Sequence, residues 1–72
     1  MKMNIRFKII DNAEKEHIRK KEVKYTKDLM QDLRAFEKYY KAKRIYFYLY
    51  GNQYCFNCET RRMEVIQYWE KQ

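Results

Sequence analysis

Residues 45–58 read IYFYLYGNQYCFNC, two runs rich in aromatic side chains on either side of Gly51-Asn52. Aromatic and β-branched residues favour strands. A two-residue loop with glycine at its first central position is typical of a tight hairpin. The sequence therefore predicts strands at about 45–50 and 53–58, joined as an antiparallel pair.

The loop also predicts the register of this pair. If Gly51-Asn52 is the whole loop, the facing residues are Tyr50–Gln53, Leu49–Tyr54, Tyr48–Cys55 and Phe47–Phe56. Directly facing residues share one side of a sheet. One side is apolar and is predicted to be core: Ile45, Phe47, Leu49, Tyr54, Phe56 and Cys58. The other side is polar and aromatic: Tyr46, Tyr48, Tyr50, Gln53, Cys55 and Asn57.

The N-terminal residues predict a further strand at about 3–10. Apolar and polar side chains alternate there, in the order Lys2, Met3, Asn4, Ile5, Arg6, Phe7, Lys8, Ile9. This period of two is the pattern of a strand with one buried face. Its other face is predicted to carry three cations.

An amphipathic helix is predicted at about 27–43. Its apolar positions are separated by four, three and four residues, at Leu29, Leu33, Phe36 and Tyr40. Thr26 is in a position to cap the helix, and Asp28 suits the positive end of the helix dipole. The apolar stripe is expected to pack against the apolar side of the sheet.

Two segments leave alternatives open. Residues 11–25 form a densely charged connection, for which a short strand, a polar helix and a mobile arm are about equally suitable. Residues 60–71 place Met63, Ile66 and Trp69 at helical spacing, but the same composition suits an edge strand. We favour the helix slightly for this last segment.

The chain of 72 residues is expected to be a single domain, with no proline, one glycine and no serine to form linkers. Its longest apolar run is far shorter than the roughly 20 residues that span a bilayer. We find no signal-peptide pattern and expect a cytoplasmic protein without membrane contact. The predicted fold class is α+β: a small two-layer domain with an antiparallel sheet and one helix on its apolar face.

The charge of the chain is strongly and unevenly positive. Seventeen Lys and Arg against ten Asp and Glu give a net charge of +7. Residues 1–24 contribute +4 (eight basic, four acidic), residues 25–50 contribute +3 (six and three), and residues 51–72 contribute zero (three and three). This asymmetry predicts an electropositive face and an acidic partner.

The polar-aromatic side of the hairpin is the strongest candidate site. Aromatic side chains on an open sheet can stack on unpaired bases, and neighbouring cations can neutralise phosphates. The sequence therefore predicts a binding domain for nucleic acid, with RNA or single strands favoured. The candidate residues are Lys2, Arg6, Lys8, Lys43, Arg44, Tyr46, Tyr48 and Tyr50. Tyrosines that simply cover the sheet under the C-terminal segment would give the same pattern.

A protein partner is the alternative. A small, basic chain without linkers would suit an inhibitor or adaptor, for example from a phage or other mobile element, that docks on an acidic host protein. Tyrosine and arginine are also favoured at the energetic centres of protein interfaces. Such a protein could act as a homodimer.

Catalysis, metals and cofactors are not indicated. Cys55 and Cys58 form a single C-x-x-C pair, whereas a structural zinc site needs four ligands, and His17 is the only histidine. On a regular strand the two cysteines point to opposite faces, so we predict two unlinked thiols. The usual nucleophile and acid–base sets are missing, so a non-enzymatic role is expected.

Overall fold

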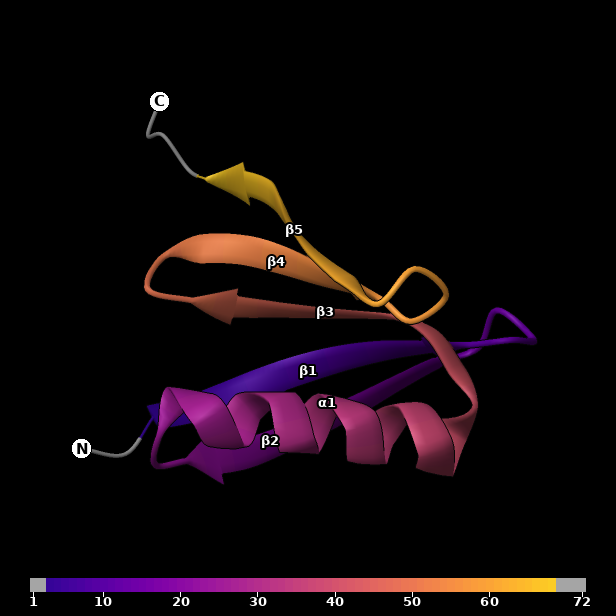
Figure 1. The fold of residues 1–72 in the computed structure, drawn as a ribbon, viewed down its shortest axis with the longest axis horizontal. Helices are drawn as coiled ribbons and strands as arrows, with labels where there is room; N and C mark the ends of the chain where they lie inside the picture. The colour runs from indigo at the N-terminus through magenta and orange to yellow at the C-terminus, as the bar shows by residue number, and fades with distance from the viewer. Residues whose placement is uncertain (1–2, 69–72) are drawn as a thin grey trace.

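The protein is a five-stranded antiparallel sheet with one helix, a small α+β domain (Figure 1). The computed structural model describes residues 3–68, apart from the side chains of Thr26, Gln67 and Tyr68. In chain order the elements are β1 (Met3–Asp11), β2 (Glu16–Val23), α1 (Thr26–Tyr40), β3 (Ala42–Leu49), β4 (Asn52–Asn57) and β5 (Arg62–Tyr68). The strand order is β2-β1-β3-β4-β5. Within residues 3–68, no helix has the length and apolar character needed to cross a membrane.

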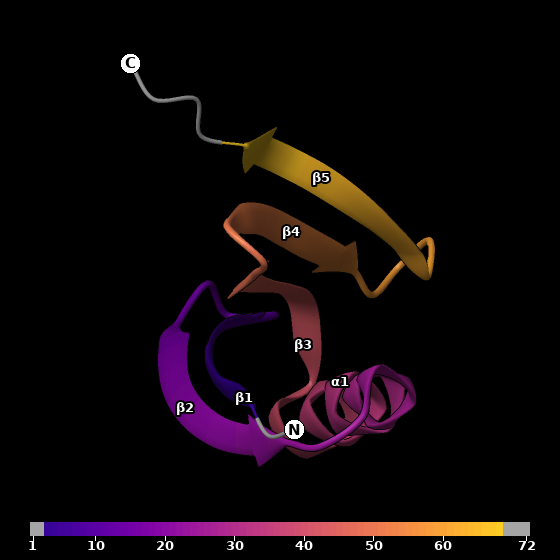
Figure 2. The same ribbon diagram turned by 90° about the vertical axis from the view of Figure 1, so that its left-hand side faces the viewer.

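The helix covers only part of the sheet. It packs against β1, β2 and β3, while β4 and β5 extend beyond it (Figure 2). We call the side that carries α1 the helix-side face and the opposite side the open face. The helix-side face therefore has a covered half, under α1, and an uncovered half formed by β5, the Tyr54 end of β4 and the Leu49 end of β3.

The core lies between α1 and the covered half of the sheet. Phe7 is completely buried, with its ring centroid 5.0 Å from Phe36 and 5.7 Å from Phe47. Most of the residues around it come from the predicted apolar stripes of the strands and the helix: Ile5, Ile9, Leu29, Leu33, Ile45, Phe56 and Cys58. Val23 and Ala42, outside those stripes, complete the core. On the predicted apolar side of the hairpin, Ile45, Phe47, Phe56 and Cys58 are thus confirmed as core, whereas Leu49 and Tyr54 are partly buried at its margin.

Helix α1 is shorter than predicted. It ends at Tyr40, and Lys41 then adopts a left-handed conformation with φ of 56°, donating its backbone N–H to the Glu37 carbonyl. This turn allows Ala42 to begin β3 with its side chain buried. The predicted end at residue 43 was wrong because the cations after Tyr40 belong to the turn and to the next strand.

The charged connection contains a full strand, β2. It pairs with β1 from Met3–Val23 to Ile10–Glu16. Apart from the buried Val23, its helix-side residues are polar but reach α1: Lys21 Nζ lies 2.9 Å from Asp32, and the His17 and Tyr40 rings stack at 4.5 Å. The sequence did not single out this strand because its packing face is made of charged and polar side chains with long stems.

The predicted register of the hairpin was wrong by two residues. Leu49 pairs with Asn52, so Tyr50 and Gly51 form the loop, with φ of 54° and 82°. Two consecutive positive φ angles are required by the hairpin turn whose twist matches the flanking strands. Because side chains alternate with period two, a shift of two residues leaves each side chain on its predicted face.

The C-terminal segment is an edge strand, so the slight preference for a helix was wrong. In β5, Met63 pairs with Phe56 and Val65 with Tyr54, on the helix-side face. A β-bulge follows, because Gln67 is the next residue to face β4. Trp69, which supported the helix, lies outside the described residues.

Candidate nucleic-acid interface

The open face of the sheet brings aromatic rings and cations together on neighbouring strands. Lys8 of β1 faces Tyr46 of β3, and the Lys8 Nζ atom lies 5.7 Å from the Tyr46 ring centroid. Two residues along each strand, Arg6 and Tyr48 occupy the same face. Alternation forces this arrangement, because the intervening residues of both strands point into the core.

The two tyrosines of this row differ in exposure. Tyr48 is 53% exposed, so one side of its ring is open to a ligand. Tyr46 is half-buried, and burial together with its neighbour Cys55 raises the pKa of its hydroxyl. Tyr46 is therefore a neutral phenol at physiological pH and can donate a hydrogen bond.

A shallow depression of about 440 Å³ lies on this face, between the cations of β1 and the tyrosines of β3. The residues that line it include Arg6, Lys8, Ile18, Tyr46, Tyr48 and Gln53. Gln53 pairs with Tyr48 across β3 and β4, and its amide adds a donor and an acceptor. The depression can thus accommodate a flat polar ring beside a positive edge.

Five of the eight predicted residues lie on this surface: Arg6, Lys8, Arg44, Tyr46 and Tyr48. Tyr50 lies in the β3–β4 loop, 74% exposed, at the end of the row. The ammonium of Lys43 forms an ion pair with Glu14, so its charge is already partly balanced. Lys2 lies outside the described residues.

The open face carries two further cations that were not predicted from the sequence. Lys20 of β2 faces Arg6, and Arg62 of β5 faces Asn57, which in turn faces Arg44. The alternation of side chains along β2 and β5 assigns these two cations to the open face. It can be used only when the two segments are known to be strands. The open face therefore carries two separate cationic groups, Lys20 with Arg6 in one cross-strand row and Arg44 with Arg62 in another.

Carboxylates on the same face are fewer than cations. Glu16 lies 3.8 Å from Lys8, and both side chains are exposed, so this contact is weak. Among the described residues, Arg6, Lys20 and Arg44 have no carboxylate within ion-pair distance. These three side chains can therefore contact an anion without first breaking an internal ion pair.

The two cysteines are free thiols, as predicted. Cys58 is 6% exposed within the core, and burial and the nearby Glu37 raise its pKa to about 11. Cys55 belongs to the open face but is 3% exposed between Tyr46 and Glu64, and burial raises its pKa too. Thiols protonated in this way are poor nucleophiles. Residues 3–68 contain no cluster of three His, Cys, Asp or Glu side chains that could hold a metal.

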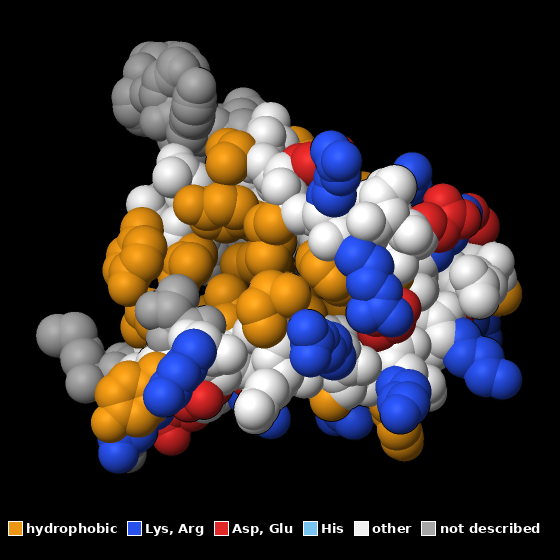
Figure 3. All heavy atoms as spheres, in the orientation of Figure 1, with side chains coloured by type: hydrophobic (Ala, Val, Ile, Leu, Met, Phe, Trp, Pro, Cys, Tyr) orange, Lys and Arg blue, Asp and Glu red, His pale blue; other side chains and the backbone are white. Residues whose placement is uncertain are grey.

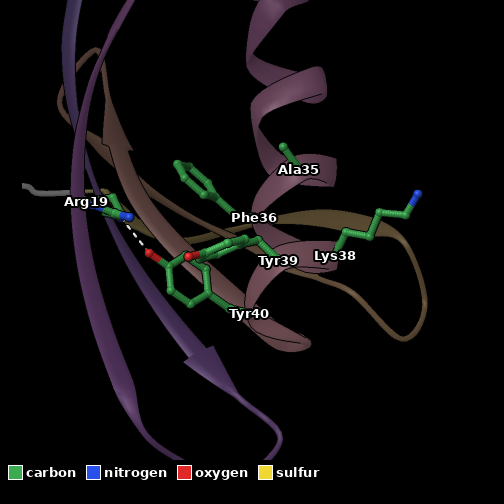
Figure 4. A pocket seen from close by; sticks show the side chains of 6 residues that line it. All are labelled: Arg19, Ala35, Phe36, Lys38, Tyr39 and Tyr40. Atoms are coloured by element: carbon green, nitrogen blue, oxygen red, sulfur yellow. Dashed lines mark hydrogen bonds between the residues drawn. The ribbon is translucent and has the colours of Figure 1, made fainter.

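A second hollow, of about 540 Å³, lies between the end of α1 and β2. Figure 4 shows Phe36, Tyr39 and Tyr40 grouped there, with Arg19 donating to the Tyr40 hydroxyl. Its lining is mostly apolar, and its arginine already has a hydrogen-bond partner. It can pack an apolar group, but it offers less recognition chemistry than the open face.

Comparison of the chain with protein-family models, with curated proteins and with solved structures found no match.

Proposed function

We propose that this protein is a non-enzymatic binder of single-stranded nucleic acid, RNA in preference to DNA, and that the open face of the sheet is its binding surface. The observation that supports this function is the side-by-side placement of cations on β1 and tyrosine rings on β3, seen directly in the contact of Lys8 with Tyr46. Rings and cations at strand spacing match the two repeating parts of a nucleic-acid strand.

Each part of the strand has a matching group on this surface. A base stacks on the exposed ring of Tyr48, which is worth about 1–3 kcal/mol for one base. Phosphates lie along the cations without carboxylate partners, Arg6 and Lys20 on one flank and Arg44 on the other. Neighbouring strands are roughly 4.8 Å apart, so the cations lie beside the rings instead of competing with them.

The width of the surface favours a single strand over a duplex. Five strands span roughly 19 Å, four spacings of about 4.8 Å. The major groove of duplex DNA is only about 12 Å wide and admits a helix or a two-stranded ribbon. A single strand can lie across the sheet with its bases unstacked and accessible.

The first test measures stacking. Fluorescence anisotropy with a labelled mixed-sequence RNA is compared for the wild type, Tyr48→Ala and Tyr39→Ala. Tyr39 is 75% exposed but lies on α1, so it controls for loss of an exposed tyrosine. We expect Tyr48→Ala to weaken binding about 5- to 150-fold, the equivalent of 1–3 kcal/mol, and Tyr39→Ala to leave it unchanged. Equal effects of the two variants would contradict the proposal.

The second test separates placed charge from net charge. Arg6→Ala and Arg34→Ala remove the same charge, but Arg34 is exposed on α1. We expect only Arg6→Ala to weaken binding, and to lower the slope of log affinity against log salt by about 0.7. Equal losses would mean that binding depends on charge alone. A matching single-stranded DNA then tests the preference for RNA.

Absence of binding to both nucleic acids at low salt would overturn the proposal. It would leave the alternative of a small inhibitor or adaptor that docks on an acidic protein. An aromatic protein interface changes little with salt, so the two functions differ in their salt response.

A further inference from the structure

The edge strand β5 exposes three apolar side chains. Met63, Val65 and Ile66 are 38%, 53% and 44% exposed. Met63 and Val65 lie on the helix-side face beside the half-buried Leu49 and Tyr54, where α1 does not reach. We call these four residues, Leu49, Tyr54, Met63 and Val65, the apolar shelf. Figure 3 shows the corresponding apolar patch over β3, β4 and β5, with Lys and Arg side chains along its border.

The outer edge of β5 has no strand partner within residues 3–68. Its backbone N–H and C=O groups are therefore available to another strand. Proteins usually protect such edges with proline, inward-pointing charges or a covering element. Here the shelf side of the edge carries Met63 and Val65 instead. An apolar, uncovered edge of this kind favours association with another strand.

We propose that two copies of this chain form a homodimer by antiparallel pairing of β5 with β5 of the second copy. A two-fold axis perpendicular to the sheet keeps the two open faces on one side and the two helices on the other. The two apolar shelves then become neighbours, and Met63 packs against its counterpart near the axis.

The charges of β5 select one register. With the axis at Met63, residues 62–64 of the two copies pair, so that Arg62 faces Glu64 of the second copy and the reverse contact forms by symmetry. Arg62 and Glu64 both lie on the open face, so the two charge pairs form without entering the shelf. An axis at Glu64 would place two carboxylates opposite each other, which is destabilising. An axis at Val65 would place Glu64 opposite Ile66, at the bulge, and leave its charge without a partner.

The dimer does not depend on nucleic-acid binding, but it would extend the proposed binding surface. Both open faces lie on the same side, and the five strands of one copy continue through β5 into the five strands of the other. A strand of RNA could then contact both copies. Dimerisation without RNA binding would disprove the proposed function alone, and RNA binding by a monomer would disprove this inference alone.

Sedimentation velocity without nucleic acid, up to roughly 0.1 mM protein, tests the dimer. We expect the wild type to dimerise with concentration and Met63→Lys to remain monomeric, because two lysines would meet at the axis. Ile18→Lys is the matched control, because Ile18 is 43% exposed on the other edge strand, and it should dimerise like the wild type. A monomeric wild type, or equal behaviour of the two variants, would overturn the inference.

A charge exchange identifies the register. We expect Arg62→Glu and Glu64→Arg each to weaken dimerisation about 10-fold or more, since each places like charges opposite each other. Mixing the two variants restores opposite charges at both pairs, so the mixture should dimerise more tightly than either variant alone. The double variant R62E/E64R should also dimerise. A mixture that remains monomeric would overturn the register. A mixture that dimerises cannot be explained by misfolding of either variant.

Discussion

The two edge strands of this sheet have opposite chemistry. β2 has only one buried residue, Val23, and is otherwise mostly charged, whereas β5 exposes Met63, Val65 and Ile66. The helix lies along β2 and exchanges polar contacts with it, including Lys21 with Asp32. It does not extend to β5. One edge is thus held inside the domain by polar contacts, and the other offers apolar side chains to a partner.

This difference shows how one short helix stabilises a sheet that is wider than itself. The 15 residues of α1 cover β1, β3 and the inner side of β2, and the core is concentrated there. A domain of 72 residues buries a modest share of its surface and has a thin stability margin. The covered half should therefore carry most of the free energy of folding, and the uncovered half should be available for binding.

The largest expected effect comes from truncating the centre of the covered half. Phe7→Ala removes a fully buried ring and should cost about 3–5 kcal/mol of the free energy of unfolding. That loss approaches the whole stability of a small domain. Val65→Ala, on the shelf, should cost about 0.5 kcal/mol or less in the monomer. Urea unfolding followed by circular dichroism measures both, and equal losses would show that the shelf is part of the core.

The reactivities of the two cysteines measure the protection of the two halves, Cys58 in the covered half and Cys55 beside the edge strand β5. At neutral pH the Cys58 thiolate should be about 100-fold rarer than an ordinary thiolate, because its pKa is about 11 instead of 9.0. Cys55 is covered by Tyr46 and by the edge strand β5. With the single-thiol variants Cys58→Ala and Cys55→Ala, we expect Cys55 to react faster than Cys58 with a disulfide reagent in the native state.

The unfolded state provides the control for this measurement. In urea both thiols should react at the same, much higher rate. Native Cys55 should also become less reactive as protein concentration rises, if pairing of two β5 strands holds that edge in place. A native Cys58 that reacts as fast as Cys55 would contradict the greater protection of the covered half.

The sequence could predict the parts of the fold in which apolar period and burial coincide. The alternation at residues 3–10, the stripe from Leu29 to Tyr40 and the apolar side of the hairpin supply most of the core. Their outer residues Met3, Phe36, Tyr40, Leu49 and Tyr54 are partly buried against it. β2 and β5 were difficult because neither alternates a buried apolar face with an exposed polar face. Apart from Val23, polar side chains form the packing side of β2, and in β5 the spacing of Met63 and Ile66 imitates a helix.

The candidate site was partly predictable for the same reason. Arg6, Lys8, Tyr46 and Tyr48 could be assigned to one face because their own strands alternate clearly. Lys20 and Arg62 could not be added, because their strands were not identified. The hairpin loop was misplaced because a tyrosine with positive φ is uncommon, and the sequence offered Gly51-Asn52 as an easier loop.

The ion pair between β2 and α1 should have a smaller effect than either truncation of the core or protection of the thiols. The Asp32 side chain is 14% exposed, and its contact with Lys21 is 2.9 Å long. Asp32→Asn should lower the free energy of unfolding by about 1 kcal/mol or less. Glu16→Gln, which alters the longer and more exposed contact with Lys8, should have no measurable effect. A larger effect of Glu16→Gln would indicate that the open face stabilises β2 more than the helix does.

The smallest effect should appear in acid, at the β1–β2 turn. Asp11 accepts hydrogen bonds from His17 and from the backbone N–H groups of Ala13 and Lys15, and the His17 contact is the main cause of its lowered pKa. A carboxyl with a lowered pKa stabilises the fold above its ordinary value of 3.8 and loses that contribution as the pH falls below it. In Asp11→Asn, the melting temperature should therefore fall less steeply with acid than in the wild type. An acid transition that survives unchanged in Asp11→Asn would contradict this assignment and would have to come from other carboxylates, such as Asp32 on α1.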